Sequence, residues 1–195
     1  MQHQNMSYFW YEAAHAMVGP LRAVSEATGV FLRSPSNPFS ALPAAKQMAA
    51  ACDLFERSTR RYGKPAFGLE RTVVNGEIVS VSERIDWENT FCKLIHFERA
   101  IIESHRADPK LLIVAPMSGH YATLLRGTVE AFLPGHEVYI TDWTDARMVP
   151  LAAGAFDLDD YIDYVMAMLR HLGPGVHVMG VCQPSVPVAA AVARM

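Results

Sequence analysis

Cys182 lies in a sequence context that suits a nucleophile. Residues 176–181 (Val-His-Val-Met-Gly-Val) are typical of a buried strand, and they lead directly into Cys182, Gln183 and Pro184. A strand, a sharp turn with a nucleophile at its apex and an immediate helix form a nucleophile elbow, and Gly180 supplies the small residue two positions earlier. Pro184 stands where a second glycine is usual, and proline suits the first turn of a helix. The helix N-terminus favours an anion, so we expect this thiol to ionise readily.

A second segment supplies the groups that would stabilise an oxyanion. In the nucleophile elbow, the backbone N–H after the nucleophile is one donor, and this places Gln183 at the developing charge. The other donor comes from the loop after a neighbouring strand, so residues 111–115 point to Met117 or Ser118. The alternative is a structural thiol, because cysteine after a buried strand is commonly a small core residue. The Gly-x-Cys pattern by itself favours that alternative, and the 111–119 segment favours chemistry.

Other residues that could take part are less well placed. All eight histidines precede Cys182 in the chain. The order in α/β-hydrolases is nucleophile, acid, then histidine, which argues against His120 as the base. Asp142 ends a predicted strand, but it too precedes Cys182, so Asp142 and Asp145 are interpreted as loop residues that position the next segment. No histidine or cysteine spacing is typical of a metal site, and no metal or cofactor is expected.

The elements before residue 110 are mostly helical. Apolar periodicity predicts a helix over residues 7–28, with a break or kink at Pro20 because proline removes a helix hydrogen bond. Aromatic residues 8–11 are expected to pack in the core rather than touch an apolar polymer. Asn75-Gly76 between β-branched residues indicates a hairpin. The remaining predictions are a loop over 33–43, a helix over 43–62, and a segment 86–104 that fits either a helix or, in its first part, a strand.

From Lys110 onward strands and helices alternate. This order predicts an α/β fold, α/β-hydrolase-like, with a mostly parallel sheet. Asp157 is expected to cap the helix that ends at Leu172. The predicted division of the chain is a helical segment with a β-hairpin over residues 1–109 and the first part of the α/β core over residues 110–195.

Composition excludes several classes of protein. The chain has 195 residues, 51% of them hydrophobic, with a formal net charge of −3, which argues against disorder and against nucleic acid as a partner. Its longest apolar stretches fall short of the roughly 18 residues that a membrane span needs. Cys52, Cys92 and Cys182 are odd in number and widely spaced, so they do not predict a disulfide framework, and a reducing cytoplasm fits best.

Five segments carry a resemblance to a known family: residues 8–12, 115–121, 139–143, 156–161 and 180–184. Through them the chain resembles, over nearly its whole length, the intracellular polyhydroxybutyrate depolymerases. The resemblance implies a cytoplasmic α/β-hydrolase that cleaves ester bonds of the stored polyester at granule surfaces, without a cofactor. It carries the role of nucleophile onto Cys182. The related polyester synthases also use a cysteine elbow, but theirs usually has glycine where this chain has Pro184.

The resemblance also implies residues that this chain does not contain. In a complete member, further strands after the elbow bring an aspartate and a histidine to the nucleophile, whereas this sequence stops at Met195. We therefore interpret it as an N-terminal fragment or a truncated reading frame, and expect little or no activity from it alone. Two alternatives stay open: a non-catalytic granule-associated protein, and an acyltransferase related to the synthases. Polymer chain-length preference and oligomeric state are not predicted.

Overall fold

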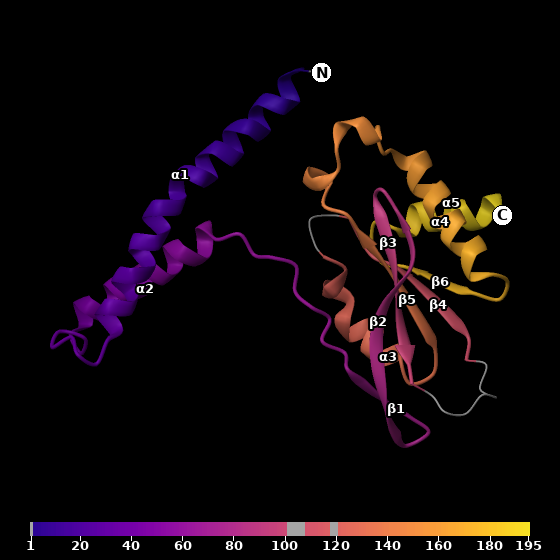
Figure 1. Cartoon of the computed structure of the whole chain (residues 1–195), viewed down its shortest axis with the longest axis horizontal. Helices are drawn as coiled ribbons and strands as arrows, with labels where there is room; N and C mark the ends of the chain where they lie inside the picture. Colours follow the sequence, from indigo (N-terminus) through magenta and orange to yellow (C-terminus); the bar gives the residue numbers. More distant parts are fainter. Residues whose placement is uncertain (1, 101–107, 118–120) are drawn as a thin grey trace. The chain divides into compact units, whose positions relative to one another are not determined.

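The structure is a computed structural model that describes residues 2–100, 108–117 and 121–195. The chain folds as two compact units that meet between Gly63 and Lys64 (Figure 1). The boundary predicted at residues 109/110 lies inside the second unit. The hairpin and the segment that follows it belong to the same sheet as the later strands, so they cannot be separated from it.

The first unit is a pair of helices, α1 (Gln2–Arg33) and α2 (Pro43–Thr59), joined by a short loop. Arg22 of α1 donates hydrogen bonds to the hydroxyl and the carbonyl oxygen of Thr59, and Ser25 donates to the carbonyl oxygen of Cys52. Pro20 lies inside α1, and the helix continues past it, so of the expected break or kink the break does not occur. Proline has no backbone N–H, so one helix hydrogen bond is lost at Pro20. The contacts of Arg22 and Ser25 with α2 stabilise the part of α1 that follows the proline.

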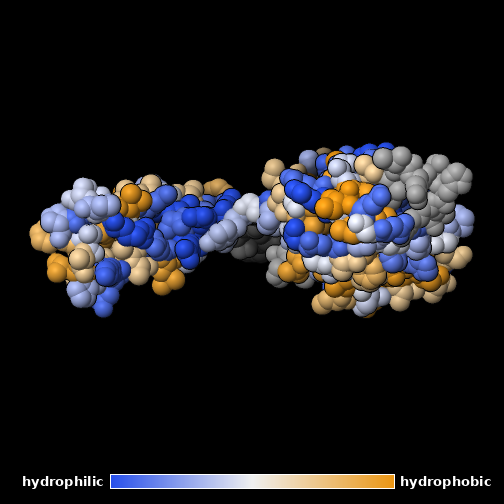
Figure 2. Space-filling model, turned by 90° about the horizontal axis from the view of Figure 1, so that it is seen from below, coloured by the Kyte–Doolittle hydropathy of each residue, from blue (hydrophilic) through white to orange (hydrophobic). Residues whose placement is uncertain are grey.

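Aromatic side chains of α1 face outward rather than into a core. Phe9, Trp10 and Tyr11 are each more than half exposed, and apolar surface is visible on this unit in orange (Figure 2). The expectation that residues 8–11 pack inside is therefore wrong for these three, since the polar contacts of α1 with α2 are made further along the helix, by Arg22, Ser25 and Arg33. No helix among the described residues is long and apolar enough to cross a membrane.

The second unit is built on one six-stranded mixed sheet. The strands lie in the order β1-β2-β3-β5-β4-β6 (Figure 1). Their bounds are β1 Arg71–Val74, β2 Glu77–Asn89, β3 Cys92–Arg99, β4 Lys110–Val114, β5 Glu137–Trp143 and β6 His177–Gly180. Asn75 and Gly76 both have positive φ in the β1–β2 turn, which confirms the predicted hairpin.

The expectation of a mostly parallel sheet is wrong. Three of the five strand pairs are antiparallel, and only β5-β4 and β4-β6 are parallel. The difference arises in the ambiguous segment 86–104, where the described residues form the end of β2 and all of β3. Cys92 and Leu94 pack on one face of the sheet and Ile95 and Phe97 on the other. This two-residue alternation belongs to a strand, and the short β2–β3 connection forces antiparallel pairing.

Helices cover both faces of the sheet and give a mixed α/β architecture. Short helix η1 (Ala122–Leu125) and α3 (Arg126–Phe132) pack on one face. On the other face lie α4 (Leu158–Leu172) and α5 (Ser185–Arg194). Asp157 caps α4 as predicted, since its carboxylate accepts hydrogen bonds from the backbone N–H groups of Asp159 and Asp160. Two short helices, η2 (Ala146–Met148) and η3 (Leu151–Ala153), connect β5 to α4.

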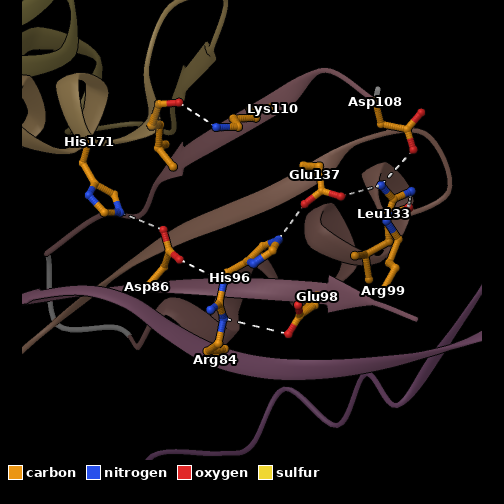
Figure 3. A network of polar contacts seen from close by, with 11 residues as sticks. Arg84, Asp86, His96, Glu98, Arg99, Asp108, Lys110, Leu133, Glu137 and His171 are labelled. Atoms are coloured by element: carbon orange, nitrogen blue, oxygen red, sulfur yellow. Dashed lines mark hydrogen bonds and ion pairs between the residues drawn. The ribbon is translucent and has the colours of Figure 1, made fainter. Parts of the chain in front are cut away.

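A buried polar network lies at the end of the sheet where the parallel strands β4 and β5 begin (Figure 3). The Arg99 side chain, 1% exposed, donates to the carbonyl oxygen of Leu133 and forms ion pairs with Asp108 at 2.8 Å and Glu137 at 3.3 Å. His96 Nε2 donates to Glu137 at 2.7 Å, and its ring stacks on Tyr139. Because this network surrounds the first residue of β5, it lies at the opposite end of the strands from Cys182.

The network makes stability depend on pH. The hydrogen bond from His96 is the main cause that lowers the pKa of the Glu137 carboxyl, and Arg99 acts in the same direction. A lowered pKa in the folded state means that the carboxylate stabilises the fold above the unfolded pKa of about 4.3 and that this contribution is lost as the pH falls. We expect Glu137→Gln to lower the midpoint of thermal unfolding at pH 7 and to have a smaller effect at pH 3. An equal effect at both pH values would contradict this assignment.

Candidate active site

Cys182 lies at a sharp corner between strand β6 and helix α5. Its backbone φ is +65°, a conformation that non-glycine residues rarely adopt and that is strained. The turn is closed by Ser185, whose backbone N–H and hydroxyl both donate to the Cys182 carbonyl oxygen, at 3.1 and 2.8 Å. The Cys182 residue is exposed. The strand, the turn and the helix therefore lie where the sequence predicts them, with the thiol on the outside of the corner.

Gly180 allows the strand and the helix to approach closely. A Cβ atom at this position would lie 3.0 Å from Ser185 Cα and 3.1 Å from the Pro184 carbonyl carbon and oxygen. All three are backbone atoms, which cannot rotate away as a side chain can. Pro184 itself is buried and precedes the first residue of α5. Gly180 therefore lies where the strand approaches the helix closely, and Pro184 lies at the start of the helix.

We expect Gly180→Ala to destabilise the second unit by about 1–3 kcal/mol, the usual cost of inserting an atom into a close-packed site. Urea unfolding measures this free energy. Gly127→Ala is the matched control, because a Cβ at Gly127 meets no atom within 4 Å and the residue lies in helix α3. If both variants unfold at the same urea concentration, the close approach of strand and helix does not exclude a side chain at position 180.

Two backbone donors predicted for an oxyanion are brought to one edge of the sheet. β4 and β6 are adjacent and parallel, so the residues that follow them lie at the same end. The Met117 backbone N–H donates to the Gln183 side-chain oxygen, Oε1, at 3.3 Å. Within the described residues the backbone N–H of Gln183 has no hydrogen-bond partner. The Met117 N–H thus already holds a carbonyl-type oxygen, and this oxygen belongs to the side chain of the residue that follows Cys182.

Two side chains of β5 hold the loop that carries Met117. The sequence analysis did not predict these contacts. Thr141, fully buried, accepts a hydrogen bond from the Ala115 N–H at 2.8 Å, and Trp143 Nε1 donates to the Ala115 carbonyl oxygen at 2.9 Å. Both polar groups of Ala115 are therefore held two residues before Met117. A polar residue inside an otherwise apolar, buried strand is the sequence signal that could have found Thr141.

The other predicted residues are only partly located. Ser118 and His120 lie outside the described residues. Asp142 lies inside strand β5, opposite Lys93, so its interpretation as a loop residue is wrong. Its carboxylate forms an ion pair with Lys64 of the same unit. Among the described residues, no side chain makes a hydrogen bond to the Cys182 sulfur, and no group of three histidine, cysteine or acidic residues could hold a metal ion.

The three thiols differ in accessibility, and this predicts their reactivity. Cys182 is exposed, Cys52 is half-buried and Cys92 is fully buried. Burial also raises the pKa of the Cys92 thiol well above its ordinary value. Because thiolates rather than thiols react, we expect iodoacetamide to label Cys182 first and to leave Cys92 unmodified in the native protein. Peptide mass spectrometry measures the order, and labelling of Cys92 as fast as Cys182 would contradict it.

Comparison with known proteins adds no family assignment. No family model matches the chain, and neither a curated protein nor a solved structure is significantly similar to it. The catalytic role of Cys182 and the depolymerase resemblance therefore stay predictions, and the geometry of the corner is the evidence that bears on them.

Proposed function

We propose that this chain carries the nucleophile of an α/β-hydrolase that cleaves ester bonds of poly(3-hydroxybutyrate). The observation that carries the proposal is the exposed thiol of Cys182, held at a positive φ between a strand and a helix. The hydrogen bond from Met117 to the Gln183 side chain supports it, because it brings the loop after β4 to this corner. Catalytic nucleophiles occupy such strained corners in unrelated α/β enzymes.

The reaction follows from the chemistry of these groups. The Cys182 thiolate attacks the ester carbonyl carbon, and the carbonyl oxygen becomes an oxyanion that accepts hydrogen bonds from the N–H groups of Gln183 and Met117. For Met117 to donate, the ester oxygen replaces the Gln183 side-chain oxygen. The carbon–oxygen bond to the alcohol part of the ester then breaks, and the alkoxide leaves with the electron pair and takes a proton from the solvent. The acyl group stays on Cys182 as a thioester. Water hydrolyses the thioester and releases the acid.

The general base is not assigned to any described residue, and this determines what the chain should do alone. An unassisted thiolate can form the thioester slowly, whereas hydrolysis of the thioester needs an activated water. We therefore expect the acyl-enzyme to accumulate. The acyl-enzyme can also react in a second way, by transfer of its acyl group to another hydroxyl instead of to water, as in the synthases.

The test is to incubate the protein with the p-nitrophenyl ester of 3-hydroxybutyrate and to map the acylated residue by mass spectrometry. A 3-hydroxybutyryl thioester on Cys182 supports the proposal. Acylation confined to other residues, or absent altogether, contradicts it. Adding water-soluble oligomers of hydroxybutyrate then separates the two fates of the acyl group, since release of free acid indicates hydrolysis and lengthened oligomers indicate transfer.

A second function, binding to an apolar polyester surface without catalysis, is favoured by one observation on α1. Trp10, Met17, Val24 and Phe31 follow one another at intervals of seven residues, which places them along one face of the helix. Their exposed fractions are 66%, 77%, 65% and 63%. Single exposed apolar residues are ordinary, but a continuous stripe of large ones marks an interaction surface.

This second function predicts that charge on the stripe weakens binding. The double variant M17E/V24E should remain in the supernatant after centrifugation with polyhydroxybutyrate granules, whereas the unmodified protein should sediment with them. A16E/A23E is the matched control, since it adds the same charge at two exposed positions on α1 outside the stripe. Equal sedimentation of both variants and the unmodified protein would show that the stripe does not bind the polymer.

A further inference from the structure

A cavity lies beside the loop that carries Met117. Its volume is about 300 Å³, and its wall combines the β2–β3 turn, the loop after β4, the connection with η2 and η3, and the segment before α4. None of the described residues that line it is charged. Its lining includes Phe91, Met117, Thr144, Ala146, Leu151, Gly154 and Phe156.

The floor of the cavity is held by contacts that need no ligand. The rings of Phe91 and Phe156 lie 4.8 Å apart, and the Thr144 backbone N–H donates to the Phe91 carbonyl oxygen at 2.9 Å. Gly154 has a φ of +93°, which lets the chain turn back so that Phe156 reaches this floor. The mouth is open, since Leu151 lines the cavity and is 87% exposed. The cavity is therefore preformed and accessible.

Met117 connects the cavity to the candidate oxyanion site. Its backbone N–H holds the Gln183 side-chain oxygen at 3.3 Å, and the same residue lines the cavity. If an ester oxygen takes the place of the Gln183 oxygen, the ester carbonyl carbon is one bond away from that position. A short chain attached to this carbon can then enter the space lined by Met117.

We propose that this cavity binds the acyl chain of the ester and selects short, uncharged aliphatic chains. The proposal rests on the proposed function, because it requires the ester to be attacked by Cys182. The apolar lining gains free energy from each methylene group that leaves water, and it provides no partner for a charged chain. The small volume limits the length, since about 300 Å³ is at the lower end of ligand pockets.

The test measures acylation of Cys182 by p-nitrophenyl esters of acetic, butyric, decanoic and succinic acid. The thiolate sulfur forms a bond to the acyl carbon, the bond to the p-nitrophenolate oxygen breaks, and p-nitrophenolate leaves with the electron pair while the thiol proton passes to the buffer. Each methylene that enters the cavity should raise the rate constant about fourfold, which corresponds to about 0.8 kcal/mol. We expect butyryl to react about 15-fold faster than acetyl on this basis, decanoyl to gain little more, and succinyl to react more slowly than butyryl.

Ala146→Trp fills the cavity from an exposed position, and Ala152→Trp is the matched control on η3, outside the lining. The A146W variant should lose the preference for butyryl over acetyl, and its circular dichroism spectrum should match that of the unmodified protein, which shows that it is folded. The A152W variant should keep both rates. Acylation of Cys182 without chain-length preference, or with the preference intact in A146W, overturns the cavity proposal alone. No acylation of Cys182 by any ester contradicts the proposed function, and the cavity proposal fails with it.

Discussion

Cys182→Ala is expected to abolish thioester formation on this residue, because alanine has no atom that can attack the ester carbonyl carbon. The comparison is best made with the p-nitrophenyl ester of 3-hydroxybutyrate in excess over the protein, so that the first turnover appears as a burst. The burst of p-nitrophenolate and the mass increment on the peptide that contains Cys182 should both disappear.

The fold of this variant should be nearly unchanged. Cys182 is exposed, and alanine keeps the same Cβ atom at a φ of +65°, so the strain of the corner is the same in both proteins. We expect the free energy of unfolding to change by less than about 0.5 kcal/mol, as for other surface substitutions. Cys52→Ala is the control with an equal chemical change, and it should retain the burst. If the burst survives in Cys182→Ala, another residue is the nucleophile.

Arg99→Leu is expected to lower the free energy of unfolding by about 3–5 kcal/mol, the cost of removing one partner from a buried ion pair. Its side chain is 1% exposed and neutralises Asp108 and Glu137, which lie 2.8 and 3.3 Å from its guanidinium. Leucine also leaves the Leu133 carbonyl oxygen without the donor at 2.9 Å. A loss of this size is a large fraction of the stability of an ordinary domain.

Arg84→Leu is the control for this prediction. Arg84 forms ion pairs with Asp86 and Glu98, but its side chain is 56% exposed. Exposed pairs contribute about 0–1 kcal/mol, so urea unfolding of Arg84→Leu should stay close to that of the unmodified protein. If the two variants lose the same free energy, water reaches the Arg99 network and burial is not the source of its strength.

We therefore expect one end of the sheet to contribute mainly to stability and the other to the proposed reaction. The Arg99 network holds the ends where β4 and β5 begin, and the elbow and the Met117 loop follow the ends where β4 and β6 finish. Ligands in open α/β sheets bind outside the carboxyl ends of the strands. We thus expect Arg99→Leu to act through stability and Cys182→Ala through chemistry, and the two measurements separate these effects.

Local signals in the sequence were sufficient for several parts of this protein. The Asn75-Gly76 turn, the Asp157 cap and the strand–turn–helix around Cys182 were predicted correctly, because each depends on the conformational preference of residues adjacent in the chain. The role of Gly180 is also a local property of the sequence, because β6 and the helix that directly follows it approach too closely there for a side chain.

Tertiary structure decided the rest. The apolar residues of segment 86–104 could bury as a helix or as a strand, and pairing of β3 with β2 and β5 settled this for the described residues. The clamp of Thr141 and Trp143 on Ala115 and the hydrogen bond from Met117 to Gln183 join residues distant in the chain. The sequence determined which backbone turns are possible, whereas long-range burial and hydrogen bonding determined which neighbours meet, because those energies depend on segments that come together only when the chain folds.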